Sequence, residues 1–133
     1  MSCSIPDDLR FHIGHLWMRP SERSDLVLVG ISDFAQKQLG KIIFVDMPRV
    51  GDAIEMGEPF GAVESNKVVS ELIAPVSGEI VEINSLLKQS AGLLNEDCYG
   101  TAWIAKVSLA GGADLSGLLT SDQYAARLGE KAR

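Results

Sequence analysis

The apolar residues of this chain are gathered into short runs, and each run is closed by residues that favour turns. Runs of this length, rich in valine, isoleucine and leucine and ending at glycine, proline, serine or asparagine, are typical of β-strands. We predict strands at Leu26–Ile31 and at residues 41–45, 60–64, 68–73, 79–83 and 102–107. Strands that follow one another so closely pack as sheets, so the sequence predicts a mainly β fold.

Short helices are predicted between the strands. Ser32 should cap a helix at Asp33–Leu39, and Gly40 stands where that helix should end. Ser85 is a second candidate cap, for a short helix through residues 86 and 87.

Near the C-terminus a helical period replaces the strand pattern, after a loop predicted at residues 92–100. Thr120 and Gln123 match a capping box, which places the start of a C-terminal helix at Ser121. The apolar residues that recur at helical spacing are Leu115, Leu118, Leu119, Ala125 and Leu128.

Charge, length and cysteine content limit the classes of function. The 133 residues carry 12 basic and 18 acidic side chains, whereas nucleic acids and anionic membranes need a positive surface. The length suits a single domain, residues 1–133. Cys3 and Cys98 are too few for a disulfide framework, and the sequence shows neither a signal-peptide pattern nor an apolar run near the ~20 residues that span a bilayer. We expect a cytoplasmic protein with no nucleic-acid or membrane partner.

The chain contains a faint internal repeat. Residues 40–45 are similar to residues 78–83, and residues 58–61 are echoed by residues 97–100 at nearly the same offset. Two related β units would then flank one joining segment at residues 64–70. A chance match between short β patterns explains the similarity equally well, so both explanations stay open.

Four polar residues join two of the apolar runs. They are Glu64, Ser65, Asn66 and Lys67. Serine and asparagine favour turns because their side chains bond nearby backbone groups, so Lys67 should project from the tip of a hairpin. By spacing alone, a solvated surface lysine is the favoured interpretation.

Several blocks of the sequence resemble the glycine-cleavage H proteins, in order and with family-like spacing. Glu64-Ser65-x-Lys67, followed by residues 74–84, resembles the lipoylation region of that family. The other matching blocks are His15-x-Trp17 and residues 29–40, 48–52 and 95–103. On these blocks, the chain is identified as a member of the family, with a core from about residue 11 to residue 128.

The resemblance implies a flattened β-barrel, the barrel-sandwich hybrid of lipoyl domains, with short helices and a C-terminal helix. It implies that a lipoyl ligase or transferase joins lipoic acid to Lys67 through an amide, on the hairpin between two quasi-repeated halves. The family is non-catalytic, so no catalytic residues are expected. Its arm ends in a strained, readily reduced cyclic disulfide, and a rigid hairpin would present that ring to several partners at high effective concentration.

The resemblance also implies partners. In glycine cleavage, a glycine decarboxylase loads an aminomethyl group onto the arm, an aminomethyltransferase removes it, and a dihydrolipoyl dehydrogenase reoxidises the dithiol. Asn66 and Val68 depart from the usual residues beside the lysine, and Cys98 replaces a proline. These departures resemble H-protein-like lipoate-binding proteins that carry sulfur intermediates for a heterodisulfide-reductase-like complex in sulfur oxidation. Glycine cleavage is the favoured assignment because that branch of the family is the commoner one, sulfur oxidation is the alternative, and the three residues are expected to tune partner choice.

Other interpretations are weaker. His12 and His15 could form a metal pair, but no third ligand accompanies them, so no metal site is expected. Cys98 is expected to be a partly buried residue rather than a reactive thiol. A biotinyl carrier would flank its lysine with methionines, which are missing here, and a lipoyl domain of a 2-oxo acid dehydrogenase would lack residues 32–40 and the C-terminal helix.

Overall fold

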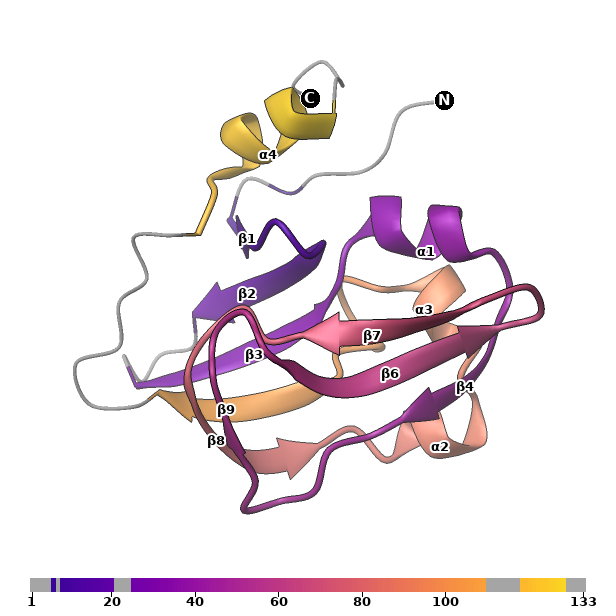
Figure 1. Ribbon diagram of the computed structural model, residues 1–133, viewed down its shortest axis with the longest axis horizontal. Coiled ribbons are helices and arrows are strands. Elements are labelled where there is room, and N and C mark those ends of the chain that lie inside the picture. The colour runs from indigo at the N-terminus through magenta and orange to yellow at the C-terminus, as the bar shows by residue number, and fades with distance from the viewer. Residues whose placement is uncertain (1–5, 7, 21–24, 110–117, 129–133) are drawn as a thin grey trace.

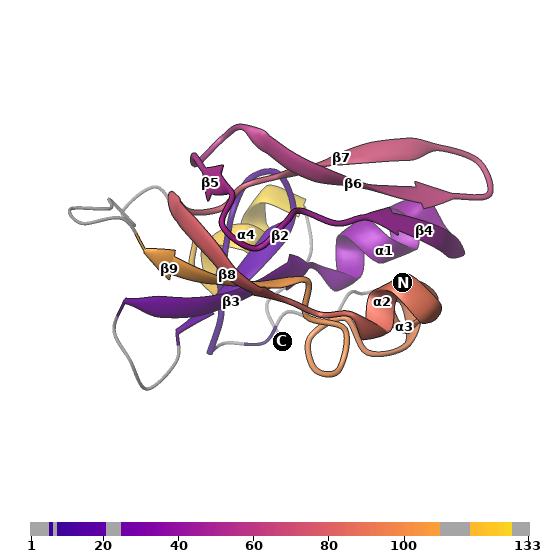
Figure 2. The same ribbon diagram turned by 90° about the horizontal axis from the view of Figure 1, so that it is seen from below.

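The computed structural model describes residues 6, 8–20, 25–109 and 118–128, and its strands form two antiparallel sheets (Figure 1). The larger sheet has the order β1–β2–β3–β9–β8–β5, with strands Arg10–Phe11, Leu16–Pro20, Leu26–Ile31, Ala105–Leu109, Gly78–Ile83 and Ala53–Ile54. The smaller sheet has the order β4–β6–β7, with strands Ile42–Asp46, Pro59–Ser65 and Val69–Ile73. Figure 2 shows the β6–β7 hairpin as a layer that lies over β8 and β9.

The core lies between the two sheets. Val45 and Val63 of the smaller sheet are at most 4% exposed, and Val29 and Val107 of the larger sheet are fully buried. Successive side chains of a strand point to opposite faces, so these strands bury one face and leave the other to solvent. The predicted mainly β fold, a flattened β-barrel of the barrel-sandwich type with short helices and a C-terminal helix, is confirmed, although the two sheets do not close into a complete barrel.

Most predicted strands lie where the sequence placed them. β3 has the predicted bounds, β7 and β8 differ from theirs by one residue at one end, and β4 and β6 differ by one residue at each end. The strand predicted at residues 102–107 instead begins at Ala105. The amide of Ala102 donates a 3.1 Å hydrogen bond to the carbonyl of Asp97, and this bond closes a turn before the strand.

The sequence repeat has a limited structural counterpart. Its first members lie in different sheets, because residues 40–45 lead into β4 whereas residues 78–83 are part of β8. Its second members are not equivalent: residues 58–61 lead into β6, and residues 97–100 lie in a turn. The repeat therefore corresponds to a strand in both halves only at its first members, β4 and β8.

The helix α1 (Asp33–Leu39) begins and ends as predicted. Ser32 Oγ accepts a 3.1 Å hydrogen bond from the amide of Ala35. Gly40 follows the helix with a φ of 81°, a conformation that residues with a Cβ rarely adopt. This sharp turn directs the chain from α1 straight into β4.

The C-terminal helix α4 (Ser121–Leu128) also has the predicted cap. The amide of Thr120 donates to Gln123 Oε1 over 2.9 Å, and the amide of Gln123 donates back to Thr120 Oγ1 over 3.2 Å. Tyr124 is 1% exposed and stacks on Phe11, with ring centroids 4.4 Å apart. These contacts hold α4 against the β1 end of the larger sheet (Figure 1).

Two short helices differ from the predictions. In α2 (Leu86–Gln89) the side chain of Ser85 makes no capping bond, and Asn84 Oδ1 instead accepts a 3.3 Å bond from the first amide of the helix. The loop prediction for residues 92–100 is wrong in part, because α3 (Leu93–Glu96) lies within it. A helix of one turn is unstable alone, and it forms here because its Leu94 is fully buried.

The strands β1, β2 and β5 were not predicted. β1 and β2 pair through Phe11 and Trp17, and the chain reverses between them at His15, whose φ is 70°. The helices of the described residues are all too short and too polar to cross a membrane. Cys3 and Leu115 lie outside the residues that the structure describes.

Candidate functional site

The tip of the β6–β7 hairpin (residues 65–68) is fixed by one buried hydroxyl. Ser65 is 4% exposed, and its backbone amide donates a 2.8 Å hydrogen bond to the carbonyl of Val68. Its Oγ accepts from the amides of Lys67 and Val68 over 3.3 Å and 3.2 Å. The side chain thus replaces backbone partners inside the turn, as predicted for serine at this position. The tip is therefore a defined turn.

Lys67 occupies the outer side of this tip and is exposed, as the sequence predicted. None of the ion pairs recorded among the described residues involves its ammonium group. Its side chain lies along the backbone of Gly40: a Cβ added there would be 3.4 Å from Lys67 Cε and 3.7 Å from Nζ. The tip therefore exposes a primary amine to solvent beside Gly40, a residue that has no side chain.

The tip rests on the α1–β4 junction (residues 40–42). The amide of Asn66 donates to the carbonyl of Lys41 over 3.3 Å. The junction in turn is held by Asn95 of α3, whose Oδ1 accepts from the amide of Ile42 over 2.8 Å and whose Nδ2 donates to the carbonyl of Gly40 over 2.8 Å. Three separate parts of the sequence thus meet beneath Lys67.

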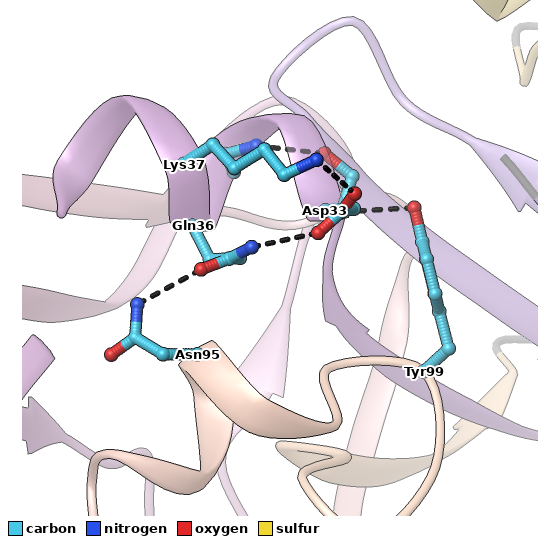
Figure 3. A network of polar contacts seen from close by, with 7 residues as sticks. Asp33, Gln36, Lys37, Asn95 and Tyr99 are labelled. Carbon is cyan, nitrogen blue, oxygen red and sulfur yellow. Dashed lines mark hydrogen bonds and ion pairs between the residues drawn. The ribbon is translucent and has the colours of Figure 1, made fainter. Parts of the chain in front are cut away.

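A network of polar contacts continues from Asn95 along α1 (Figure 3). Asn95 Nδ2 also donates to Gln36 Oε1 over 2.9 Å, and Gln36 Nε2 donates to Asp33 Oδ1 over 2.7 Å. Lys37 Nζ lies 3.1 Å from the same carboxylate, and the backbone amide of Asp33 donates to the hydroxyl of Tyr99 over 2.9 Å. The network ties both ends of α1 to the segment that precedes β9.

The outer face of the smaller sheet, beside the tip, combines apolar and acidic side chains. The residues that share this face, in two rows across the sheet, are Phe44, Glu64 and Val69, and Asp46, Ala62 and Glu71. Phe44 is 57% and Val69 is 63% exposed. Large apolar side chains with this exposure, surrounded by carboxylates, are typical of surfaces that contact other proteins.

Cys98 does not reach a surface that a partner could contact. It is buried, and burial raises the pKa of its thiol to about 12. Its carbonyl accepts a 3.0 Å hydrogen bond from Trp17 Nε1. The prediction of a partly buried, unreactive residue is confirmed, whereas a direct role of Cys98 at a partner interface does not agree with its burial.

The two histidines serve the fold. The described residues contain no group of three or more potential metal ligands. His15 Nδ1 lies 2.8 Å from the hydroxyl of Tyr124, which is also 2.7 Å from Ser32 Oγ. His12 Nδ1 accepts a 3.0 Å hydrogen bond from the amide of Gly14. Burial lowers the pKa of both histidines, so the neutral imidazoles fit these partners.

Sequence reasoning found the lysine but not its support. The sequence marks Gly40 as a helix end and as a member of the repeat and of a family-like block, and Asn95 as part of another such block, but it indicates no link between them. Their shared position under the tip depends on contacts between residues 55 positions apart. A short-range pattern carries no such signal, although the glycine after a capped helix does indicate an unusual turn at this place.

Comparisons with known proteins agree with the fold and the sequence blocks. A family model described as glycine cleavage H-protein matches residues 9–131. A probable glycine cleavage system H protein from Natronomonas pharaonis is 47% identical over 128 residues, which are 96% of this chain and 99% of that protein. The glycine cleavage system H protein of Carboxydothermus hydrogenoformans is 43% identical over 127 residues, which are 96% of each chain. A crystal structure of a glycine cleavage system H protein from Mycobacterium marinum superposes with a TM-score of 0.86 at 37% identity, covering 94% of this chain and 99% of that one.

Proposed function

The chain belongs to the glycine cleavage H-protein family, whose members carry lipoate on a lysine, and we propose that Lys67 is the attachment site in this chain. The observation that carries the proposal is the exposed amine of Lys67 on a turn that the buried Ser65 hydroxyl fixes. A modifying enzyme can reach such an amine without unfolding the carrier.

Attachment would form an amide between Lys67 Nζ and the carboxyl carbon of lipoate. The modifying ligase or transferase supplies the activated carboxyl group, whose leaving group departs as the amine loses a proton. The product is a neutral arm that ends in a cyclic disulfide, rooted beside an acidic and apolar sheet face. The carrier contributes placement, and the enzymes that accept the arm supply the acid–base chemistry.

We further propose that the whole chain works as one carrier domain in the cytoplasm. The arm would take an aminomethyl group from glycine decarboxylase, pass it to aminomethyltransferase, and be reoxidised by dihydrolipoyl dehydrogenase. The carrier function of the family supports this assignment. Phe44 and Val69, close to the root of the arm, are the side chains that a docked partner would bury first.

Attachment is tested by intact-mass analysis of the protein after incubation with lipoate, ATP and a lipoate ligase. We expect one lipoyl adduct, mapped to Lys67 by peptide sequencing, and no adduct in Lys67→Arg. Lys41→Arg is the matched control, because it removes an exposed lysine beside the tip and should leave the adduct unchanged. An adduct on Lys37, Lys41 or Lys88 would refute the assignment.

The second candidate is a sulfur carrier for a heterodisulfide-reductase-like complex, and the unusual tip favours it. Asn66 and Val68 flank Lys67 and are both exposed, so they would touch the rim of any enzyme that accepts the arm. Since Cys98 is buried, the hypothesis of partner choice now rests on the tip alone.

Partner choice is tested with the lipoylated protein and the glycine decarboxylase from the same source. A glycine-cleavage carrier supports glycine-dependent release of carbon dioxide, whereas a sulfur carrier fails there and, once its arm is reduced to the dithiol, accepts the outer sulfur of a persulfide donor, and the donor leaves as a thiol. For a sulfur carrier, Asn66→Val with Val68→Ala should restore part of the glycine-dependent rate. If the unaltered protein has full glycine-dependent activity and the double substitution does not change it, Asn66 and Val68 play no part in partner choice.

A further inference from the structure

Both polar atoms of the Asn95 side-chain amide form hydrogen bonds to the end of α1 and the beginning of β4, which lie under the tip. Its oxygen accepts from the amide of Ile42 over 2.8 Å, and its nitrogen donates to the carbonyl of Gly40 over 2.8 Å and to Gln36 Oε1 over 2.9 Å. One residue of α3 therefore joins the end of α1 to the beginning of β4. Figure 3 shows how its amide faces Gln36 across the gap between the two helices.

The α1–β4 junction that Asn95 holds contains a glycine whose backbone needs support to keep one conformation. Gly40 has a φ of 81°, and a glycine in a turn has more accessible conformations than any other residue. The same junction supports the tip through the hydrogen bond from the amide of Asn66 to the carbonyl of Lys41, and the Lys67 side chain lies beside Gly40, where an added Cβ would be 3.4 Å from Lys67 Cε. A change in the junction would therefore be passed to the lysine.

We infer that Asn95 is a positioning residue for the modification of Lys67, an inference that rests on the proposed attachment site. The amide holds the α1–β4 junction in the one conformation that supports the tip. The enzyme that attaches lipoate must recognise the turn before any arm exists, so it depends on the fraction of molecules in which the lysine is correctly placed. When that fraction falls, the apparent affinity falls in proportion.

The chain offers a matched control in Asn84. This residue is 4% exposed and also uses all of its amide: Nδ2 donates to the carbonyls of Thr101 and Trp103 over 2.7 Å and 2.8 Å, and Oδ1 accepts from the amide of Leu86 over 3.3 Å. Its partners lie before β9 and at the start of α2, and none of its hydrogen bonds within the described part of the chain is made to residues 40–42. Removing either amide breaks the same kinds of bonds, but only Asn95 supports the tip.

The test compares Asn95→Ala and Asn84→Ala as substrates of a lipoate ligase, at a temperature where both are folded. Asn95→Ala removes three hydrogen bonds from the junction, each worth about fivefold in its equilibrium, so the correctly placed fraction falls and we expect the KM for the carrier to rise about five- to tenfold, with kcat within about twofold. Amide hydrogen exchange at Ile42 and Asn66 should accelerate as well. Asn84→Ala should lower the melting temperature yet leave both readouts unchanged.

If Asn95→Ala does not fold, Asn95→Asp takes its place in the ligase assay. It keeps the acceptor for the amide of Ile42 but replaces the donor to Gly40, so it too should raise KM. An unchanged KM in the Asn95 variants, or an equal rise in Asn84→Ala, overturns the inference while Lys67 remains the attachment site. A missing adduct on Lys67 in the unaltered chain overturns the attachment site, and the inference with it.

Discussion

The tip of the β6–β7 hairpin and the aromatic cluster beneath α4 are built in opposite ways. The cluster consists of large, fully buried side chains, among them Phe11, Trp17 and Tyr124, which pack on one another. The tip exposes Asn66, Lys67 and Val68 and is held by hydrogen bonds. Burial of apolar area supplies most folding free energy, so the cluster should stabilise the fold, while the tip is free to vary for its chemistry.

The largest effect that separates the two regions is expected for Tyr124→Ala. It removes a buried ring that stacks on Phe11 and a hydroxyl 2.8 Å from His15 Nδ1, so the free energy of unfolding should fall by about 3–5 kcal/mol. Denaturant unfolding measures this loss, and Tyr124→Phe, which keeps the ring, should lose much less. Equal losses in the two variants would show that the hydroxyl, and not packing, holds α4.

A smaller effect is expected for Ser65→Ala within the tip. The substitution leaves the amides of Lys67 and Val68 without their partner, so we expect a loss of about 1–2 kcal/mol and slower lipoate attachment. Ser70→Ala removes a hydroxyl from the same hairpin outside the turn and is the control. If Ser65→Ala attached lipoate at the normal rate, the turn would not need its hydroxyl for recognition.

Mild acid should weaken the cluster and spare the tip. Burial, then the nearby charges of Arg127 and His12, lower the pKa of His15 below the ordinary value of 6.5 for an exposed histidine, so the unfolded chain binds a proton there more readily than the folded one. This contribution to stability is therefore fully present well above pH 6.5 and is lost as pH falls through 6.5 toward the lowered pKa of the folded state. His15→Asn should flatten this part of the stability profile. A slope that is unchanged in His15→Asn would assign the loss to His12, whose pKa burial also lowers.

The smallest effect is expected for Lys67→Ala. Because the side chain is exposed, its removal should change the free energy of unfolding by no more than about ±0.5 kcal/mol while abolishing lipoate attachment. Urea melts of the two proteins check the first part. A loss of several kcal/mol would mean that the lysine itself supports the junction at Gly40.

Local signals predicted much of this fold because the residues that form them are neighbours in sequence. Ser32 and Gly40 define α1, Thr120 begins the cap of α4, and Ser65 defines the turn that exposes Lys67. Each signal acts within four residues or so, a distance over which side chains compete directly with backbone partners.

The remaining features depend on distant partners. β1 pairs with β2, and its Phe11 also forms a bridge to Leu119, more than a hundred positions away. α3 is held by the burial of Leu94 and not by helix propensity. The role of Asn95 depends on Gly40 and Ile42 across the fold. Sequence patterns placed Lys67 at the exposed tip of a hairpin, but the support of that tip becomes visible only when the chain is folded.

The bond between Asn66 and the carbonyl of Lys41 limits how far this hairpin can be used as a module. A segment that comprised only residues 59–73 would bring its own turn to a foreign host, together with Ser65 and Lys67. It would leave behind the glycine backbone on which the lysine lies and the amide that holds that backbone in place. A modification tag made from this protein should therefore begin before α1 and extend through α3.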